Sequence, residues 1–559
     1  MKIFHTFFNI KKNLSLKLQR KLNISLILII VASFTELFSI SAVIGGVSFA
    51  LNEHNNTLSF LSSFKNVDPY FIIFFIFIVY LIKTLILILI LNYHTKFTSK
   101  IGYYFSSKLL VKYVNLDYGN FIQDKTATYI RNITTDIVRI NSFLYHTLYL
   151  VNELLVILIL SVLIFFIDPI TFLILLVTSV PFILIYINYT RKNIYNVGQE
   201  IRNIEEKKLF ISQQVFFGFK LIKHFEIKNF FLKNFIKNES YLATRLKFIA
   251  FISGIPRYFI DLVIVSVLLI LLIVNLAENR SSNEVILVFS AFAAAGLRIA
   301  PSISRILVAI QGIKVSLSSA EYFLENILKY NKKKIIKKNI IALNRDLEVM
   351  NASFKFDNDE KYLFKNLNIK ISKNSIIGIK GETGSGKSTL VNCLVGQLKF
   401  TEGGFYNDSK KIHQENISCH NIGLVHQDTF LLNDSIKRNI AVGVSDNLID
   451  HNKLINAIKI ANIADFVNSL QDKENTIISE NSTNISGGQK QRICIARAIY
   501  FQPQLLILDE ATNALDETTE NTILNEICSI KNNFTIIIVS HNDKVLKKCD
   551  QIIDLKNYK

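Results

Sequence analysis

A glycine-rich loop at residues 381–389 has the residue types and spacing that bind nucleotide phosphates. It reads GETGSGKST and follows a strand-like apolar run, Ile376–Ile379. Its glycines let successive backbone N–H groups curl around phosphate, and the helix expected after it adds a favourable dipole. The side chain of Lys387 can reach the β- and γ-phosphates, and the hydroxyl of Ser388 can bind Mg²⁺. The residues expected at the nucleotide are Gly381, Glu382, Thr383, Gly384, Ser385, Gly386, Lys387, Ser388 and Thr389.

Two acidic residues, Asp509 and Glu510, end a second apolar run, LLILDE, further along the chain. Open α/β sheets bind ligands at the carboxyl ends of their strands, so both acids are expected near the phosphates. Asp509 suits Mg²⁺, directly or through water, and Glu510 can polarise the attacking water as general base. A strand that ends in two acids is weak support alone, but after a phosphate loop it predicts nucleotide hydrolysis.

The segment ISGGQKQR, residues 485–492, resembles the LSGGQ signature of ABC exporters, with Ile485 in place of the leucine. In that family, the signature of a second nucleotide-binding domain completes the ATP site at a helix N-terminus. The chain has one phosphate loop and one signature, so the resemblance implies a homodimer with two composite sites. The signature residues implied at the nucleotide are Ser486, Gly487, Gly488 and Gln489.

Four further positions resemble that family. Gln427 in VHQD is similar to its Q-loop and Asp516 in ALD to its D-loop, and His541 is similar to its switch histidine. Phe356 stands where the family has an aromatic ring on adenine. The resemblance implies ATP and Mg²⁺ as cofactors. It implies catalytic roles for Glu510, His541 and Gln427, and Mg²⁺ binding by Ser388, Gln427 and Asp509.

The chain also departs from the family pattern at a few positions. Ser479 and Ser482 replace glycines often found ahead of the signature, although Glu480 keeps an acidic residue there. Asn542 follows the switch histidine where the family often has arginine. These departures concern signalling between domains and remove no catalytic group.

The composition divides the chain into a membrane half and a globular half. Of its 559 residues, 50% are hydrophobic and 19% charged, which excludes disorder and an ordinary soluble protein. Long apolar runs end near residue 320, and strand-like runs such as Leu505–Leu508 and Phe534–Val539 follow. We expect a six-helix membrane domain of the ABC exporter type, then an α/β P-loop nucleotide-binding domain with a mainly parallel sheet. The expected domains are residues 1–325 and 346–559, joined by a lysine-rich linker, 326–345.

Basic residues are distributed as in an inner membrane protein. Six Lys or Arg lie in the first 21 residues, seven between His94 and Ser142, and twelve between Arg191 and Ile249, whereas the opposite segments hold only Lys65 and Arg280. This asymmetry predicts a cytoplasmic N-terminus and a cytoplasmic nucleotide-binding domain, and it explains the net charge of +19 without a nucleic-acid partner. The expected spans are Leu22–Ala50, Tyr70–Leu91, Leu148–Ile167, Ile170–Tyr189, Phe248–Ala277 and Val285–Ile313.

Several smaller expectations concern the segments around these spans. The apolar run after the basic N-terminus is too long for a signal peptide, so we expect a retained first span. The two long cytoplasmic connections are expected to continue as helices that double back. Between spans one and two, the spacing of Leu58, Leu61 and Phe64 fits either a short interfacial helix or an ordinary loop. The five cysteines are expected to be small core residues of a reducing cytosol.

Four cations within the expected spans are candidates for binding a transported anion. An ionisable residue in a span is costly, so Lys83, Arg257, Arg298 and Arg305 indicate a functional site such as one for a diphosphate. Arg298 and Arg305 are seven residues apart and so share one helix face. Other readings stay open: Lys83 can extend to the interface, Arg257 can pair with Asp261, and Glu36 or Glu153 can neutralise another cation. These last three acids also lie in the expected spans.

A narrower resemblance concerns the transported molecule. The stretches FTELFSIS, IPRYF, LRIAPSISRIL and YLFKNLNI resemble lipid-linked oligosaccharide flippases of the PglK type. The resemblance implies an ATP-driven flippase for a polyprenyl diphosphate-linked oligosaccharide, used in protein glycosylation or surface polysaccharide assembly. It assigns the four cations to the diphosphate and the segment near Leu58–Phe64 to the polyprenyl tail. The alternatives are an exporter of another amphiphile, such as a drug or lipid A, and an ATP-gated regulatory protein.

Overall fold

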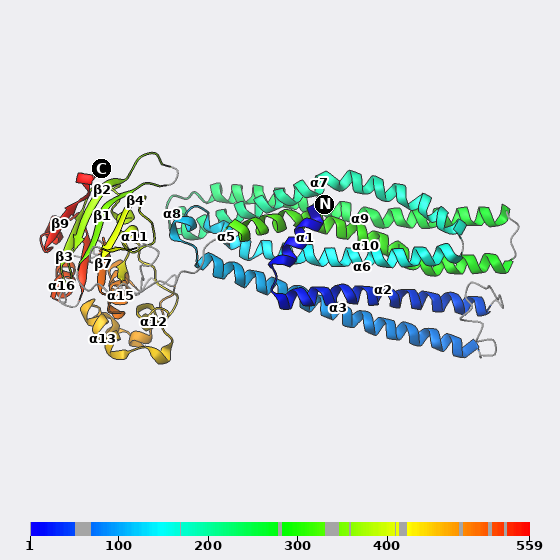
Figure 1. The fold of residues 1–559 in the computed structure, drawn as a ribbon, viewed down its shortest axis with the longest axis horizontal. Coiled ribbons are helices and arrows are strands. Elements are labelled where there is room, and N and C mark those ends of the chain that lie inside the picture. Colours follow the sequence, from blue (N-terminus) through cyan, green and yellow to red (C-terminus); the bar gives the residue numbers. More distant parts are fainter. Residues whose placement is uncertain are drawn as a thin grey trace. The chain divides into compact units, whose positions relative to one another are not determined.

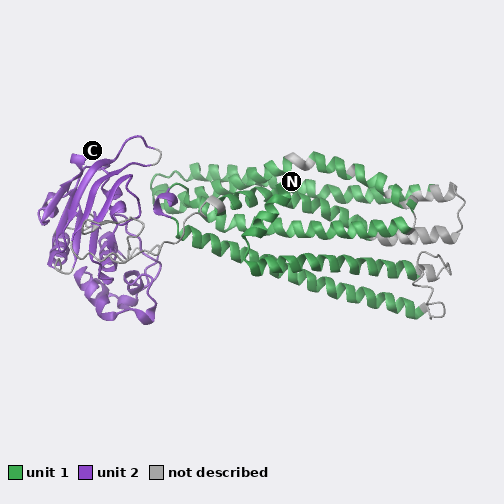
Figure 2. Ribbon diagram, in the orientation of Figure 1, with its two compact units in different colours: residues 1–116, 123–332 green, residues 117–122, 333–559 purple. Residues whose placement is uncertain are grey.

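The computed structural model divides the chain into two compact units (Figure 2). The membrane unit comprises residues 1–116 and 123–332, and the nucleotide unit comprises residues 117–122 and 333–559. The structure describes residues 2–50, 69–167, 169–277, 282–329, 346–356, 359–407, 410–412, 422–479, 485–511, 517–529 and 534–558. The expected interfacial segment at Leu58–Phe64 lies outside these ranges.

The described part of the membrane unit is helical (Figure 1). Six of its helices are long and apolar enough to cross a membrane. Their bounds are α2, Leu16–Ala50; α3, Pro69–Val114; α6, Thr135–Ile167; α7, Pro169–Phe217; α9, Lys228–Ala277; and α10, Ser282–Lys329. The shorter helices are α1, Lys2–Asn13; α5, Thr126–Ile133; and α8, Phe219–His224, while α4, Tyr118–Phe121, groups with the nucleotide unit.

The long helices extend well beyond the length needed to span a bilayer, as the sequence predicted for the two cytoplasmic connections. About 20 residues suffice to cross the hydrocarbon core, whereas α3 has 46 residues and α9 has 50. The chain turns back through α8 between α7 and α9. The expectation of six spans is therefore confirmed, and each of these helices is longer than a single span requires.

Close contacts between these helices depend on small residues. Gly198 of α7 lies against the backbone of α10, where an added Cβ would be 2.6 Å from the carbonyl oxygen of Val315. Gly312 of α10 similarly lies against the ring of His146 on α6. A side chain at Gly198 would force the two helices apart, because the backbone of α10 cannot rotate away, whereas a side chain at Gly312 would require the ring of His146 to move.

The described part of the nucleotide unit contains two sheets. The larger has the strand order β6-β7-β8-β3-β9, with all four neighbouring pairs parallel. Its β7 and β8 are buried along their whole length, because both faces of this parallel sheet are covered. The predicted parallel sheet is thus confirmed, with strands β3, Ile376–Lys380; β6, Ile422–Val425; β7, Leu505–Asp509; β8, Thr535–Val539; and β9, Gln551–Asp554.

The smaller sheet is antiparallel and was not predicted from the sequence. Its order is β2-β1-β4-β5, with β1 at its centre pairing both β2 and β4. Its strands are β1, Leu347–Phe354; β2, Phe364–Ile371; β4, Glu402–Asn407; and β5, Lys410–Ile412.

Short helices complete the described part of the nucleotide unit. They are α11, Lys387–Leu394; α12, Ile436–Ile440; α13, His451–Ile460; α14, Ala464–Ser469; α15, Gly487–Tyr500; α16, Glu517–Ser529; and α17, Asp543–Leu546. Three short 3₁₀ turns lie at Asp446–Leu448, Lys473–Asn475 and Leu555–Tyr558.

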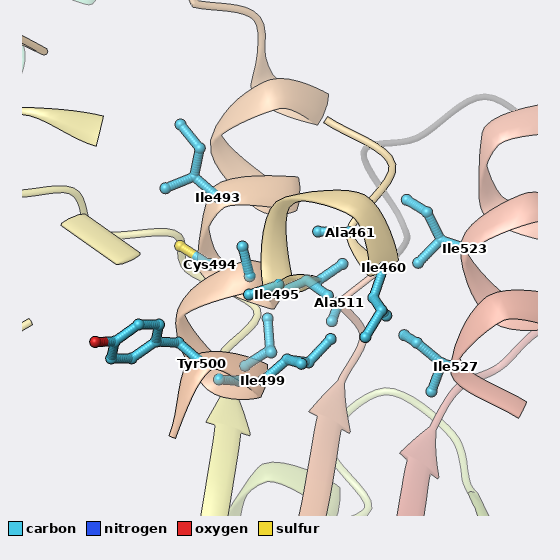
Figure 3. Packing of buried hydrophobic residues seen from close by; sticks show 14 of the residues in the cluster. Ile460, Ala461, Ile493, Cys494, Ile495, Ile499, Tyr500, Ala511, Ile523 and Ile527 are labelled. Atoms are coloured by element: carbon cyan, nitrogen blue, oxygen red, sulfur yellow. The ribbon is translucent and has the colours of Figure 1, made fainter. Parts of the chain in front are cut away.

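Two apolar cores hold the nucleotide unit together. One packs the helices α13, α15 and α16 onto the parallel sheet; Figure 3 shows Ile460 of α13 between Ile495 and Ile499 of α15 on one side and Ile523 of α16 on the other. The other core lies between the two sheets and includes α11. The described cysteines Cys393 and Cys494 are free and buried in these cores, as expected, while Cys528 and Cys549 are half-buried.

The region expected to be a linker begins inside a helix, because α10 continues to Lys329. Residues 330–345 lie outside the described part of the chain.

Candidate functional site: a phosphate loop, an acidic strand end and a charged cluster between helices

The phosphate loop lies where the sequence predicted it, between strand β3 and helix α11. Gly384 and Gly386 have φ angles of 80° and 91°, a region that residues with a Cβ rarely adopt. An added Cβ on Gly381 would lie 2.4 Å from Oγ of Ser385, which leaves no room for a larger residue. These positions therefore need glycine to form the loop.

The lysine of the loop, Lys387, is buried and folds back over the loop. Its Nζ donates to the carbonyl oxygens of Gly381 at 2.9 Å and Glu382 at 3.1 Å. Nζ also lies 3.7 Å from Oε1 of Glu510. The ammonium group is thus held at the loop, beside the carboxylate expected to act as general base.

Asp509 has the properties of a divalent-cation ligand. It is buried at the end of β7, and its Oδ1 has no hydrogen-bond partner among the described residues. Burial raises the pKa of Asp509, while a hydrogen bond from Ser388 acts in the opposite direction. A buried carboxylate oxygen without a partner is costly. A cation between Asp509 and Ser388 would satisfy it, so the residues present fit Mg²⁺.

Glu510 occupies an unusual backbone conformation. Its φ is 49°, in the left-handed region, and its backbone N–H donates to the carbonyl of Val539 at 3.1 Å. Its Oε2 accepts from Nε2 of Gln427 at 2.8 Å. Strained non-glycine residues are concentrated at functional sites. The structure therefore brings Lys387, Gln427, Asp509 and Glu510 to one edge of the parallel sheet.

Sequence reasoning did not single out Gln491, which is also near this edge. Its side chain is buried and its Nε2 lies 3.5 Å from the carbonyl oxygen of Glu510, the limit of a hydrogen bond. It stands two residues after the signature glutamine, on the inward face of α15. Helical spacing could have placed it in the interior, but not at Glu510.

The signature begins helix α15 with a complete capping box. The hydroxyl of Ser486 accepts from the backbone N–H of Gln489, and the side chain of Gln489 accepts from the backbone N–H of Ser486. This pair of bonds fixes the first turn of the helix. Ser486 and Gly487 are exposed and Gly488 is half-buried, so this helix N-terminus is open to an anion.

The other residues predicted to contact the nucleotide are exposed or lie outside the described residues. Phe356 is partly exposed and packs edge-on against Phe354. His541 is exposed just after β8. Asp516, and the acidic Glu480 with Ser482 ahead of the signature, lie outside the described residues.

Three of the four candidate cations in the membrane unit share a network with two acids. We call this network the charge ladder: Lys83 of α3, Glu36 of α2, Arg298 of α10, Glu153 of α6 and Arg305 of α10, in that order. Nζ of Lys83 lies 2.7 Å from Glu36, and Nε of Arg298 lies 3.1 Å from Glu36. Nη1 of Arg298 and Nη1 of Arg305 each lie 3.4 Å from Glu153. The ladder thus connects four helices.

The open alternatives for these cations resolve in different ways. Lys83 pairs with Glu36 and lies over the ring of Tyr80 at 4.8 Å, so it is held inside the bundle. Arg257 is exposed on α9, and among the described residues it forms no ion pair with Asp261 or with the charge ladder. The fourth candidate therefore stands apart from the other three.

Comparison with known proteins identifies the type of nucleotide unit. Residues 364–513 match the ABC transporter family. The alpha-hemolysin translocation ATP-binding protein HlyB of Proteus vulgaris is 38% identical over 214 residues, which are 38% of this chain and 30% of that protein. The multidrug resistance-like ATP-binding protein MdlB of Buchnera aphidicola is 36% identical over 38% of this chain and 37% of its own length. The chain thus matches about a third of the length of these curated relatives.

A solved structure extends the similarity to the whole fold. A bacterial Atm1-family ABC exporter with ATP bound superposes with a TM-score of 0.77 at 19% identity, covering 96% of this chain and 94% of that one. The six spans and the exporter-type relatives indicate a multi-pass inner membrane protein with its nucleotide unit in the cytoplasm. The chain therefore has the fold of an ABC exporter half, six membrane helices followed by an ABC transporter ATP-binding domain, which uses ATP with Mg²⁺.

Proposed function

We propose that the protein is an ATP-driven flippase that moves a polyprenyl diphosphate-linked oligosaccharide across the inner membrane. The observation that carries this proposal is the charge ladder, which gathers three cations and two carboxylates and so has a net charge of +1 in the membrane unit. An excess cation there is costly unless an anion compensates it. A diphosphate headgroup presents several oxygens to guanidinium groups, which bind such groups in a bidentate manner.

We propose that hydrolysis occurs at the sheet edge described above. Lys387 and the loop N–H groups hold the phosphates, and Ser388, Gln427 and Asp509 are the proposed ligands of Mg²⁺. The metal, when bound, neutralises charge that develops on the phosphates. Glu510 accepts a proton from the attacking water, and His541 senses the γ-phosphate.

The proposed working unit is a homodimer. Ser486 and the signature glycines lie at a helix N-terminus that can bind phosphate, and the sequence contains one signature and one phosphate loop. In the dimer, each signature contacts the ATP held by the partner. The other proposed nucleotide contacts are Phe356 with adenine and Asp516 with the opposite site.

A transport assay tests the proposed substrate. The protein is reconstituted in liposomes with a polyprenyl diphosphate-linked oligosaccharide, and flipping is measured with and without ATP. Replacing Lys83, Arg298 and Arg305 by glutamine, one at a time, is expected to lower flipping about ten-fold or more, equivalent to about 1.4 kcal/mol of lost headgroup binding. Basal ATP hydrolysis should remain, because the nucleotide site is unchanged. Full flipping by all three variants would exclude the headgroup assignment.

Arg257 serves as the internal comparison. Because it is exposed and outside the charge ladder, Arg257→Gln is expected to reduce flipping less than Arg298→Gln. Export of another amphiphile, such as a drug or lipid A, remains the alternative. It would be favoured if such a compound stimulated ATP hydrolysis and the diphosphate lipid did not.

A further inference from the structure

The two acids of the charge ladder are deeply buried, whereas one of its cations, Arg305, is largely exposed. The side chains of Glu153 and Glu36 are 2% and 5% exposed, whereas that of Arg305 is 45% exposed. A carboxylate so deeply buried must stay paired, because an uncompensated buried charge is strongly destabilising. Arg305, with its exposed end, can exchange its partner without being moved into the interior.

The two carboxylates hold their cations unequally. Glu36 contacts Lys83 at 2.7 Å and Arg298 at 3.1 Å, near the usual distance for a charge-assisted hydrogen bond. Glu153 holds Arg298 and Arg305 at 3.4 Å each, longer than that distance. Arg298 also donates to Oγ of Ser302 at 3.0 Å, and Asn152 approaches Glu153 at 3.5 Å. The Glu153 end of the ladder is therefore the weaker one.

From this inequality we infer that Glu153 is a resident counter-ion, which the transported anion must displace from Arg305, while Nη1 of Arg298 keeps the buried carboxylate paired. The inference rests on the proposed function in that it takes the headgroup to bind at these arginines. Glu36 keeps Lys83 and Nε of Arg298 in place throughout. Nothing covalent changes, since one anion replaces another at one guanidinium group, that of Arg305.

This exchange gives the site a charge threshold. A monoanion offers the arginines no more charge than Glu153 already supplies, so it gains little by binding. A diphosphate offers more negative charge and more oxygens, so it can compete successfully. Selectivity is then set by what the ligand must displace, in addition to what it contacts.

The same exchange also favours release. When the headgroup leaves, Glu153 recovers Arg305, so the carboxylate in the emptied site is again paired with both arginines. Removing the carboxylate is expected to raise headgroup affinity and to slow turnover, whereas loss of a purely structural contact would weaken both. These opposite signs separate the two roles.

The first test uses inorganic pyrophosphate as the probe, with inorganic phosphate for comparison. Binding is measured by the shift in unfolding temperature of the full-length protein in lipid nanodiscs, without Mg²⁺ and in a Lys387→Ala background that weakens binding at the phosphate loop. Glu153→Gln is expected to lower the half-saturating pyrophosphate concentration about ten-fold, equivalent to about 1.4 kcal/mol. The preference for pyrophosphate over phosphate should also shrink.

Two further variants keep this test decisive. Glu153→Asp retains the charge but moves it back by one methylene, so it should also lower the half-saturating pyrophosphate concentration, by a smaller factor. This variant keeps the inference testable even if Glu153→Gln folds poorly. Glu205→Gln removes an acid that pairs with Arg139 outside the ladder and should cause no shift. Unchanged or weaker pyrophosphate binding in both Glu153 variants would overturn the counter-ion inference.

A second test addresses turnover with a polyprenyl diphosphate-linked oligosaccharide. In Glu153→Gln, the lipid concentration that half-maximally stimulates ATP hydrolysis should fall while the maximal flipping rate falls as well. If the wild-type protein neither binds nor flips this lipid, the proposed function fails, and the pyrophosphate series alone decides the role of Glu153. If the lipid is flipped but Glu153→Gln loses affinity, only the counter-ion inference fails.

Discussion

Glu510 combines three features that favour a role in proton transfer. It lies 3.7 Å from the ammonium of Lys387, accepts a hydrogen bond from Gln427, and has a left-handed backbone that aims it away from the regular strand direction. Holding a residue there costs free energy, so packing around the strand end must maintain it. The energetic cost is consistent with the role proposed for this carboxylate.

Replacing this carboxylate separates ATP binding from hydrolysis. Glu510→Gln keeps the shape and the contact with Gln427 but cannot accept a proton, so hydrolysis should fall about 10²–10⁴-fold. ATP binding, measured by filter binding or thermal shift, should persist, and flipping should stop. An ATP-gated regulatory protein would instead remain open and active in this variant. That outcome would contradict the proposal that the protein is a pump.

A second residue-scale prediction concerns the metal. Burial raises the pKa of Asp509, so its protonation begins at a higher pH than that of an exposed aspartate. Mg²⁺ requires the ionised form. The apparent affinity of the ATP-bound protein for Mg²⁺ should therefore weaken as pH falls. It is measured by titrating Mg²⁺ at pH 7.5, 6.5 and 5.5. The reference is a free aspartate, whose pKa of about 3.9 keeps it ionised at these values.

The control for this pH series is Asp509→Asn, which cannot titrate at that position. Its weaker Mg²⁺ affinity should vary less with pH than that of the unmodified protein. An equal pH dependence in both proteins would show that another group is responsible.

At the scale of elements, close helix contacts determine how the membrane unit can pack. Gly198→Ala places a methyl group against the backbone carbonyl of Val315, which cannot rotate away. Helices α7 and α10 must shift, at a cost of about 1–3 kcal/mol. The unfolding temperature of the protein in nanodiscs should drop accordingly.

Gly254 of α9 provides the matched substitution. An added Cβ there meets nothing within 4 Å, and alanine is about 1 kcal/mol better than glycine within a helix. Gly254→Ala should leave the unfolding temperature unchanged or raise it slightly. Equal losses from both substitutions would mean that the contact with Val315 is not what limits stability.

The elements that sequence reasoning predicted are those specified by local pattern. The phosphate loop needs its glycines, lysine and serine within nine residues, and the buried strand before it is one continuous apolar run. The antiparallel sheet was missed because β1 pairs with β4 some sixty residues later, as in Leu347 opposite Asn407. Such pairing depends on how the residues between β1 and β4 fold.

The charge ladder shows the same limit at a functional position. Seven-residue spacing placed Arg298 and Arg305 on one face of a helix. That Glu153 lies between them depends on how α6 packs against α10, which spacing along one helix does not determine. Arg257 is not part of the charge ladder, and its separation from the other cations likewise depends on helix packing that spacing along the sequence does not determine.

At the scale of the whole molecule, the proposed composite sites make a prediction about mixed dimers. When a Lys387→Ala chain pairs with a Ser486→Arg chain, one site keeps an intact loop from one chain and an intact signature from the other. When both substitutions lie on one chain and the partner is unaltered, each site is damaged once. ATP hydrolysis by purified, differently tagged heterodimers should therefore survive only in the first arrangement.

Two outcomes would contradict the homodimer. Activity in the second arrangement but not in the first would mean that a site is built within a single chain. Activity of a monomer, measured by size-exclusion chromatography with in-line ATPase assays, would have the same meaning.

Helix α4 belongs to the nucleotide unit although it precedes most of the membrane unit in the chain. An added Cβ on its Gly119 would lie 3.4 Å from Leu398, a nearly buried residue whose surface α4 helps to cover. During synthesis at about 5–20 residues per second, α4 must wait on the order of tens of seconds before that partner exists. The nascent chain therefore carries an unfinished docking surface through the insertion of four membrane helices, and a ribosome pause in that interval lengthens its exposure to chaperones and proteases.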